Sequence, residues 1–134
     1  MMKLSLFGLA LGLALGCAPP KLSTPLTDIP HLKTLAEVMD DQATIADPQF
    51  RKIGQASFSD DDFTALAQVG ERIQVTSTKI KDFSKGPEFD AFAMQLNGHA
   101  KALQDASTAK DSAAAGKALA DMKATCKACH KAFR

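Results

Sequence analysis

The chain has 134 residues, with 16 lysines and arginines against 15 aspartates and glutamates, and a formal net charge of +1. This near-neutral balance argues against a nucleic-acid-binding protein, which needs a basic surface to neutralise phosphates. The sequence is rich in alanine, lysine and glutamine, lacks tyrosine and tryptophan, and shows no sustained alternation of apolar and polar residues. It therefore predicts an all-α protein.

Residues 1–16 have the features of an export signal, since Lys3 precedes an apolar run at 4–15 that is short for a membrane span. The sequence Leu-Ala-Leu-Gly-Cys that ends at Cys17 resembles a bacterial lipoprotein box, in which the cysteine carries the lipid. Ordinary cleavage after Ala18 is the alternative. We favour lipidation, because a third free thiol would be a liability in an oxidising compartment.

Residues 17–27 contain three prolines and predict a short, stiff tether. Removal of residues 1–16 deletes only Lys3 among the charged residues, so the mature chain has 15 basic and 15 acidic side chains. We therefore expect an exported, periplasmic protein that a lipid anchor holds at a membrane and that does not bind nucleic acid.

Residues 28–46 predict the first helix, with Asp28 as the N-cap and Pro30 in the first turn. Met39 lies at the centre of its apolar stripe, whose other members are Leu32, Leu35, Ala36, Ala43 and Ala46. Asp47-Pro48 is expected to end the helix, because the residue before a proline is disfavoured in helical conformation.

Three further amphipathic helices are expected within residues 59–134. The second opens at the Ser59 cap, which three aspartates follow, and Gly86-Pro87 separates it from the third. The chain turns again around 108–111, and the last helix is expected to run from Asp111 or Ser112 to the end. Four such helices joined by short connections predict an antiparallel four-helix bundle over residues 28–134.

The sequence Cys126-Lys-Ala-Cys129-His130 lies in the last predicted helix. Two thiols at this spacing followed by an imidazole are the attachment signature of a c-type haem, in which each thiol adds to a vinyl group and the imidazole coordinates the iron. On a helix the three side chains fall within an arc of roughly 100°. One helix face can therefore hold the macrocycle at two points and reach its iron.

Two other kinds of site use such a pair of thiols. A redox dithiol needs a lowered thiol pKa at a helix N-terminus, usually after a strand, and no strand-like run precedes Cys126. A structural zinc site needs four ligands, and only His31 and His99 remain as further nitrogen donors. An exported, non-haem dithiol or metal-binding bundle is thus the less favoured alternative.

The ending also resembles class II cytochromes c, the cytochrome c′ family. These carry CxxCH near the C-terminus of the last helix of a four-helix bundle, with an aromatic residue three positions and an arginine four positions after the histidine. Phe133 and Arg134 occupy those positions here. The resemblance implies one covalent haem c, places Arg134 near its solvent-facing edge, and is compatible with a homodimer.

By this resemblance, the first helix faces the distal side of the haem, with Met39 in its middle. Ligation by Met39 would give a low-spin iron of raised potential, suited to electron transfer. A Met39 that only shields the site would leave the iron five-coordinate and open to NO or CO, and a methionine on such a stripe is also ordinary core filler. Both interpretations remain open on the sequence.

The sequence thus favours a one-electron carrier in the bacterial cell envelope, which exchanges electrons with redox partner proteins. A haem protein that binds or buffers NO or CO is the alternative. The chain contains no Ser-His-Asp set, paired catalytic carboxylates or phosphate-binding loop, so no enzymatic activity is predicted.

Overall fold

Four long helices dominate the computed structural model, which describes residues 23–134. The helices are α1 (Leu35–Phe50), α2 (Asp60–Ile80), α3 (Pro87–Thr108) and α4 (Ser112–Phe133), with short 3-10 helices η1 (Leu26–His31) and η2 (Lys81–Phe83) before α1 and after α2. No strand is present within residues 23–134. The predicted all-α four-helix bundle is therefore confirmed, whereas the predicted export signal (1–16) and Cys17 lie outside the described residues.

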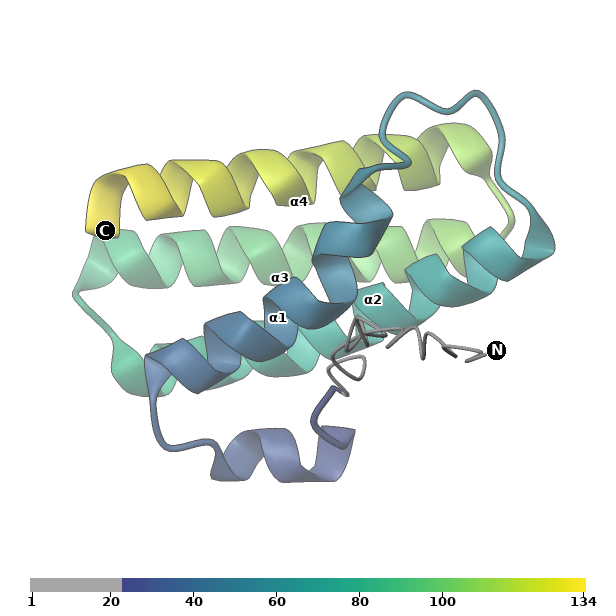
Figure 1. Cartoon of the computed structure of the whole chain (residues 1–134). Helices are drawn as coiled ribbons and strands as arrows, with labels where there is room; N and C mark the ends of the chain where they lie inside the picture. The colour runs from purple at the N-terminus through teal and green to yellow at the C-terminus, as the bar shows by residue number, and fades with distance from the viewer. Residues whose placement is uncertain (1–22) are drawn as a thin grey trace, which may run out of the picture.

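Figure 1 shows α3 and α4 as antiparallel neighbours, with α2 below α3 and α1 crossing obliquely over the other helices. The contacts between α2 and α3 and between α3 and α4 are extensive. By contrast, α1 packs mainly on α2 and touches α4 only lightly. The position of α1 relative to α4 is therefore set largely through α2.

The hydrophobic core takes side chains from all four helices. Its almost fully buried members include Val38, Leu66, Ile73, Leu103, Leu119 and Met122. Met39, the predicted centre of the first helix stripe, is only half-buried and packs at the edge of this core.

The predicted first helix (28–46) is divided in two. Residues 26–31 form η1, whose Ile29 is fully buried, and α1 begins only after Thr34. The Thr34 hydroxyl accepts a hydrogen bond from the Glu37 backbone N–H (3.2 Å), and the Glu37 carboxylate accepts one from the Thr34 backbone N–H (2.8 Å). Asp28 is therefore not the cap, because this reciprocal capping box fixes the start of the helix.

The predicted end of the first helix at Asp47-Pro48 is also wrong, since α1 continues to Phe50. Pro48 lies in the last turn of the helix. Its ring removes the N–H that residue 48 would donate to the carbonyl oxygen of Thr44, so one helical hydrogen bond is lost two residues before the helix ends.

The other three helices begin where the sequence predicts. The Ser59 hydroxyl accepts from the Asp62 N–H (3.1 Å) at the start of α2, and Asp111 accepts from the Ala114 N–H (2.9 Å) at the start of α4. Gly86, with φ of 110°, leads into Pro87 at the first position of α3.

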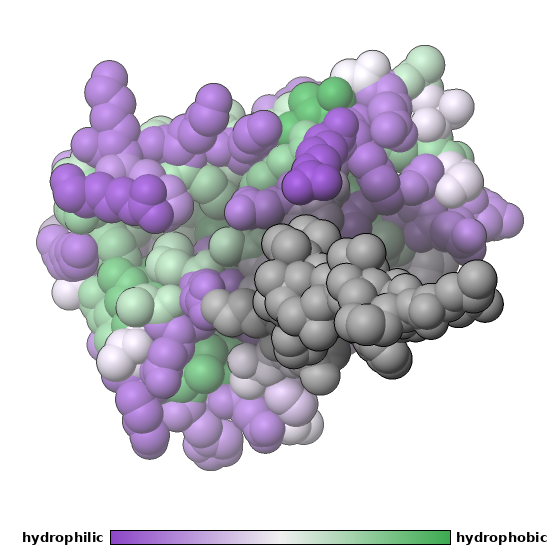
Figure 2. Space-filling view, in the orientation of Figure 1, coloured by the Kyte–Doolittle hydropathy of each residue, from purple (hydrophilic) through white to green (hydrophobic). Residues whose placement is uncertain are grey.

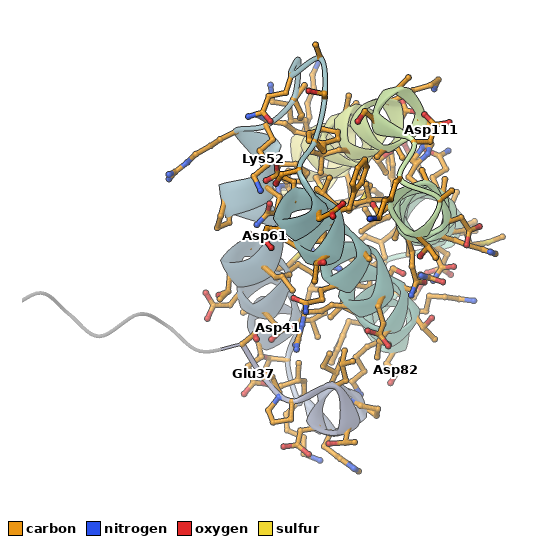
Figure 3. All side chains as sticks on the ribbon, turned by 90° about the vertical axis from the view of Figure 1, so that its right-hand side faces the viewer. Glu37, Asp41, Lys52, Asp61, Asp82 and Asp111 are labelled. Carbon is orange, nitrogen blue, oxygen red and sulfur yellow. The ribbon has the colours of Figure 1, made fainter. Side chains whose placement is uncertain are left out.

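A buried ion pair joins α1 to α2. Arg72 Nη1 lies 3.0 Å from Asp41 Oδ2, and both side chains are buried. Figure 3 shows Asp41 on the side of α1 that faces α2. The pair also holds Thr24, whose N–H donates to Asp41 Oδ1 (2.8 Å) and whose carbonyl oxygen accepts from Arg72 Nη1. The described end of the predicted tether (17–27) thus lies against the bundle.

Gly70 permits a close approach of α2 to α3. A Cβ at this position would lie 2.7 Å from the carbonyl oxygen of Ala100 and 2.8 Å from the backbone nitrogen of Gln104. Because the backbone of α3 would have to move, we expect Gly70→Ala to lower the free energy of unfolding by about 1–3 kcal/mol in denaturant titrations.

Gly98→Ala on α3 is the matched control for this substitution. No atom lies within 4 Å of a Cβ at Gly98, so alanine should stabilise the protein by about 0.5–1 kcal/mol through its higher helix propensity. If Gly70→Ala were as stable as the wild type, the close packing of α2 on α3 would be incorrect.

Candidate haem-binding site

A groove runs between α1 and α4. It consists of three cavities of about 490, 80 and 30 Å³ that share lining residues. Met39 of α1 and His130 of α4 line all three cavities. Cys129 lines the largest and the smallest, and Cys126 lines the two smaller ones. The structure therefore gathers the predicted haem-attachment residues and the predicted sixth ligand around one space.

The walls of this groove are mainly apolar. Small side chains from two helices, Ala36 and Ala43 of α1 and Ala93 of α3, leave room for a flat ring. The larger apolar side chains of the walls are Leu35, Ile73, Ile80, Phe89, Phe92, Leu96 and Met122. Such a lining suits a porphyrin, whose faces are apolar.

Charged side chains gather at the largest cavity, which forms the mouth of the groove. Lys85, Arg134 and Asp40 line this cavity together with Met39 and His130. Figure 2 shows apolar surface on the left of the view, between hydrophilic side chains over α4 and others over η1. The groove thus has a charged mouth and a mainly apolar interior, in which the lining residues also include Gln42, Asp47 and Thr125.

Cys126 and Cys129 lie in the last turns of α4 as half-buried free thiols. Burial raises the pKa of Cys126 to about 11 and also raises the pKa of Cys129. A redox dithiol requires the opposite shift, because the thiolate is its reactive form. The raised pKa of both thiols therefore disfavours the dithiol alternative.

His130 is half-buried one residue after Cys129. Burial, together with the neighbouring charge of Arg134, lowers the pKa of this imidazole. The neutral ring is the form that binds a metal, so the environment of His130 suits an iron ligand. Arg134 itself is exposed at the end of α4, and its backbone N–H donates to the carbonyl oxygen of His130 (3.2 Å).

The two other histidines lie elsewhere. His31 is exposed at the end of η1, and His99 is half-buried on α3. Within residues 23–134, no group of three or more His, Cys, Asp or Glu side chains is placed to hold a metal ion. The described chain thus does not bring His31 or His99 together with the thiols, as the zinc alternative requires.

An aromatic cluster closes the α3 side of the groove. The ring centroid of Phe133 lies 5.2 Å from that of Phe89 and 6.3 Å from that of Phe92, both edge to face. Lys85 Nζ lies 5.9 Å from the centroid of Phe89 and donates to the carbonyl oxygen of Phe133 (3.3 Å). These contacts join the end of α4 to the start of α3.

The sequence analysis did not single out Lys85 or Gln42, both of which line the groove. Lys85 immediately precedes the predicted Gly86-Pro87 start of α3. It therefore lies next to the first turn of α3, which carries Phe89. Gln42 lies three residues after Met39, a spacing that places two side chains on the same helix face.

A sequence model of the family described as Cytochrome C′ matches residues 30–134. The chain belongs to the cytochrome c′ family. It is also similar to cytochrome c′ of Pararhodospirillum photometricum, with 48% identity over 62 residues, which cover 46% of this chain and 50% of that protein. The chain thus spans about half the length of this curated relative. No solved structure matches the chain significantly.

Membership of the cytochrome c′ family identifies a c-type haem protein, because the family implies covalently bound haem. The groove fits such a group, since it combines two neutral thiols, a neutral imidazole and mainly apolar walls. Members of the family are typically periplasmic. None of the helices within residues 23–134 is long and apolar enough to cross a membrane.

Proposed function

We propose that this cytochrome c′ family member is a one-electron carrier with a single haem c. The observation that supports this proposal is that Met39 and His130 line the same three cavities from opposite helices. In the proposal, Cys126 and Cys129 would hold the macrocycle through thioether bonds, and His130 and Met39 would both coordinate the iron.

The haem supplies the chemistry, the exchange of one electron between the ferric and ferrous states. The chain supplies ligation and burial. Ligation by a thioether together with an imidazole favours low-spin iron of raised potential. Apolar wall residues such as Leu96 and Ile80 would limit the access of water to the two ligands. This combination allows electron transfer without a change of ligands.

The charged mouth of the groove suits the propionate edge of a haem. Arg134 and Lys85 line the same cavity and provide two cations there, and cations stabilise carboxylates through charge-assisted hydrogen bonds. We therefore place the solvent-facing edge of the haem at this mouth, as the resemblance implied for Arg134. Lys85 is a second propionate partner in this proposal.

The cellular setting follows from the first part of the sequence. In this proposal residues 1–16 direct export to the periplasm, and lipidated Cys17 is the only attachment to the membrane. The protein is not an enzyme, and its partners are redox proteins of the cell envelope rather than nucleic acid.

Binding of NO or CO is the second candidate function. The match to the cytochrome c′ family favours it, because the resemblance implies relatives in which an apolar side chain leaves the iron five-coordinate. In that case the half-buried Met39 would shield the iron without ligating it.

The visible spectrum of the protein purified with its haem tests the proposed function. Sharp low-spin bands with a far-red charge-transfer band are expected for ligation by His130 and Met39. A broad high-spin spectrum that changes on addition of CO would instead support gas binding. If the intact mass revealed no haem adduct, both functions would be excluded.

A further inference from the structure

Two buried polar links between α1 and α2 lie next to Met39. Asp41 and Gln42, two and three residues after Met39, are 5% and 7% exposed. Their partners on α2 are Arg72 and Thr76, which are 8% and 0% exposed. Adjacent residues of α1 are thus joined to residues one helical turn apart on α2.

The first link is charged. Arg72 Nη1 lies 3.1 Å from Asp41 Oδ1 and 3.0 Å from Asp41 Oδ2. A buried charge that loses its partner is strongly unfavourable. A shift of α1 along α2 by one turn would separate Asp41 from Arg72 and is therefore disfavoured.

The second link is a hydrogen bond with a fixed direction. Thr76 Oγ1 lies 3.0 Å from the carbonyl oxygen of Arg72 and 3.3 Å from that of Ile73, so its single proton points to its own helix. The hydroxyl oxygen can therefore only accept from Gln42, whose Nε2 lies 2.9 Å away. Because Thr76 Oγ1 must be the acceptor, the side-chain amide of Gln42 has one favourable orientation, with its NH₂ group toward Thr76.

Apolar contacts fix the position of α1 along α2 less strictly than these two polar links do. Hydrophobic burial is non-directional, and the sequence of α1 offers alanines and other small side chains that tolerate sliding. In addition, α1 touches α4 only lightly, so α4 does little to hold it. The two polar links are therefore the directional contacts that locate Met39 opposite His130.

We propose that Asp41–Arg72 and Gln42–Thr76 are positioning pairs that hold the Met39 sulfur in register for the iron. Gln42 also lines the two inner cavities with Cys126 and His130, so the second pair lies at the site itself. The inference rests on the proposed function, because it assigns these pairs a role only if Met39 is the sixth ligand.

Thr76→Val and Gln42→Leu test the proposal. Both variants remove the second link without leaving a buried charge, so the bundle should still fold, as far-ultraviolet circular dichroism can verify. We expect the far-red charge-transfer band to weaken and CO to bind the ferrous protein about tenfold faster, because the loss of one buried hydrogen bond favours release of Met39. Thr76→Ser keeps the hydroxyl and should restore wild-type behaviour.

Gln104→Leu is the matched control. Gln104 accepts a hydrogen bond from Gln74 Nε2 (2.7 Å) between α2 and α3, so the substitution removes an amide hydrogen bond at another helix pair. It should lower the unfolding midpoint and leave CO binding unchanged. If Thr76→Val changed only stability, as in this control, the positioning role would be refuted although Met39 ligates the iron. A wild-type protein with high-spin iron would overturn both the inference and the proposed electron-carrier function.

Discussion

Met39→Ala is expected to convert the iron from low spin to high spin. Met39 and His130 line the same three cavities, and an alanine side chain on α1 would be too short to reach an iron held from α4. Without the thioether, the far-red charge-transfer band should disappear, the reduction potential should fall, and the ferrous protein should bind CO rapidly. Visible spectra, redox titration and CO mixing measure these three changes.

Two further variants separate ligation from packing. Met39→Leu preserves much of the volume of the side chain but has no sulfur, so it should show the same high-spin spectrum with a smaller loss of stability. Met94→Ala removes a methionine that is 65% exposed on α3 and should leave the spectrum unchanged. If the spectrum of Met39→Ala matched that of the wild type, Met39 would not be a ligand.

Replacement of both Cys126 and Cys129 by serine is expected to abolish covalent attachment of the haem. Serine has no thiol to add to a vinyl group, so intact-mass spectrometry should detect the polypeptide without the haem. Each single variant should keep one thioether and therefore the full haem mass.

Cys17→Ser provides the control for this experiment. In the proposal this thiol carries lipid and not haem, so the variant should lose the lipid mass and keep the haem mass. An unchanged haem adduct in the double variant of Cys126 and Cys129 would contradict the assignment of the attachment residues.

Local signals predicted most of the fold. Ser59, Gly86-Pro87 and Asp111 located the starts of α2, α3 and α4, because helix caps depend on residues a few positions apart. The start of the first helix was misplaced at Asp28, although the Thr34–Glu37 capping box is visible in the sequence. Residues 26–31 instead form η1, which contacts α2 and contains the fully buried Ile29.

The predictability of the site also depends on sequence distance. Cys126, Cys129 and His130 form a local motif, and helical spacing alone places them on one face. The Asp41–Arg72 pair could not be predicted, because it depends on how two helices align across 31 residues of sequence. On a helix, an aspartate between polar neighbours, here Asp40 and Gln42, ordinarily indicates a solvated position.

If Cys17 carries a lipid, as we propose, the hydrogen bonds of Asp41 and Arg72 to Thr24 would limit how far the domain could move from the membrane. The backbone N–H and the carbonyl oxygen of Thr24 are both hydrogen-bonded to this pair. A connection to a bilayer would therefore extend only as far as residue 23 and not to residue 27, where the predicted tether ends. Seven residues from a lipidated Cys17 would span at most about 25 Å. The haem would then stay close to the membrane surface. It would meet membrane-bound electron donors by diffusion in two dimensions.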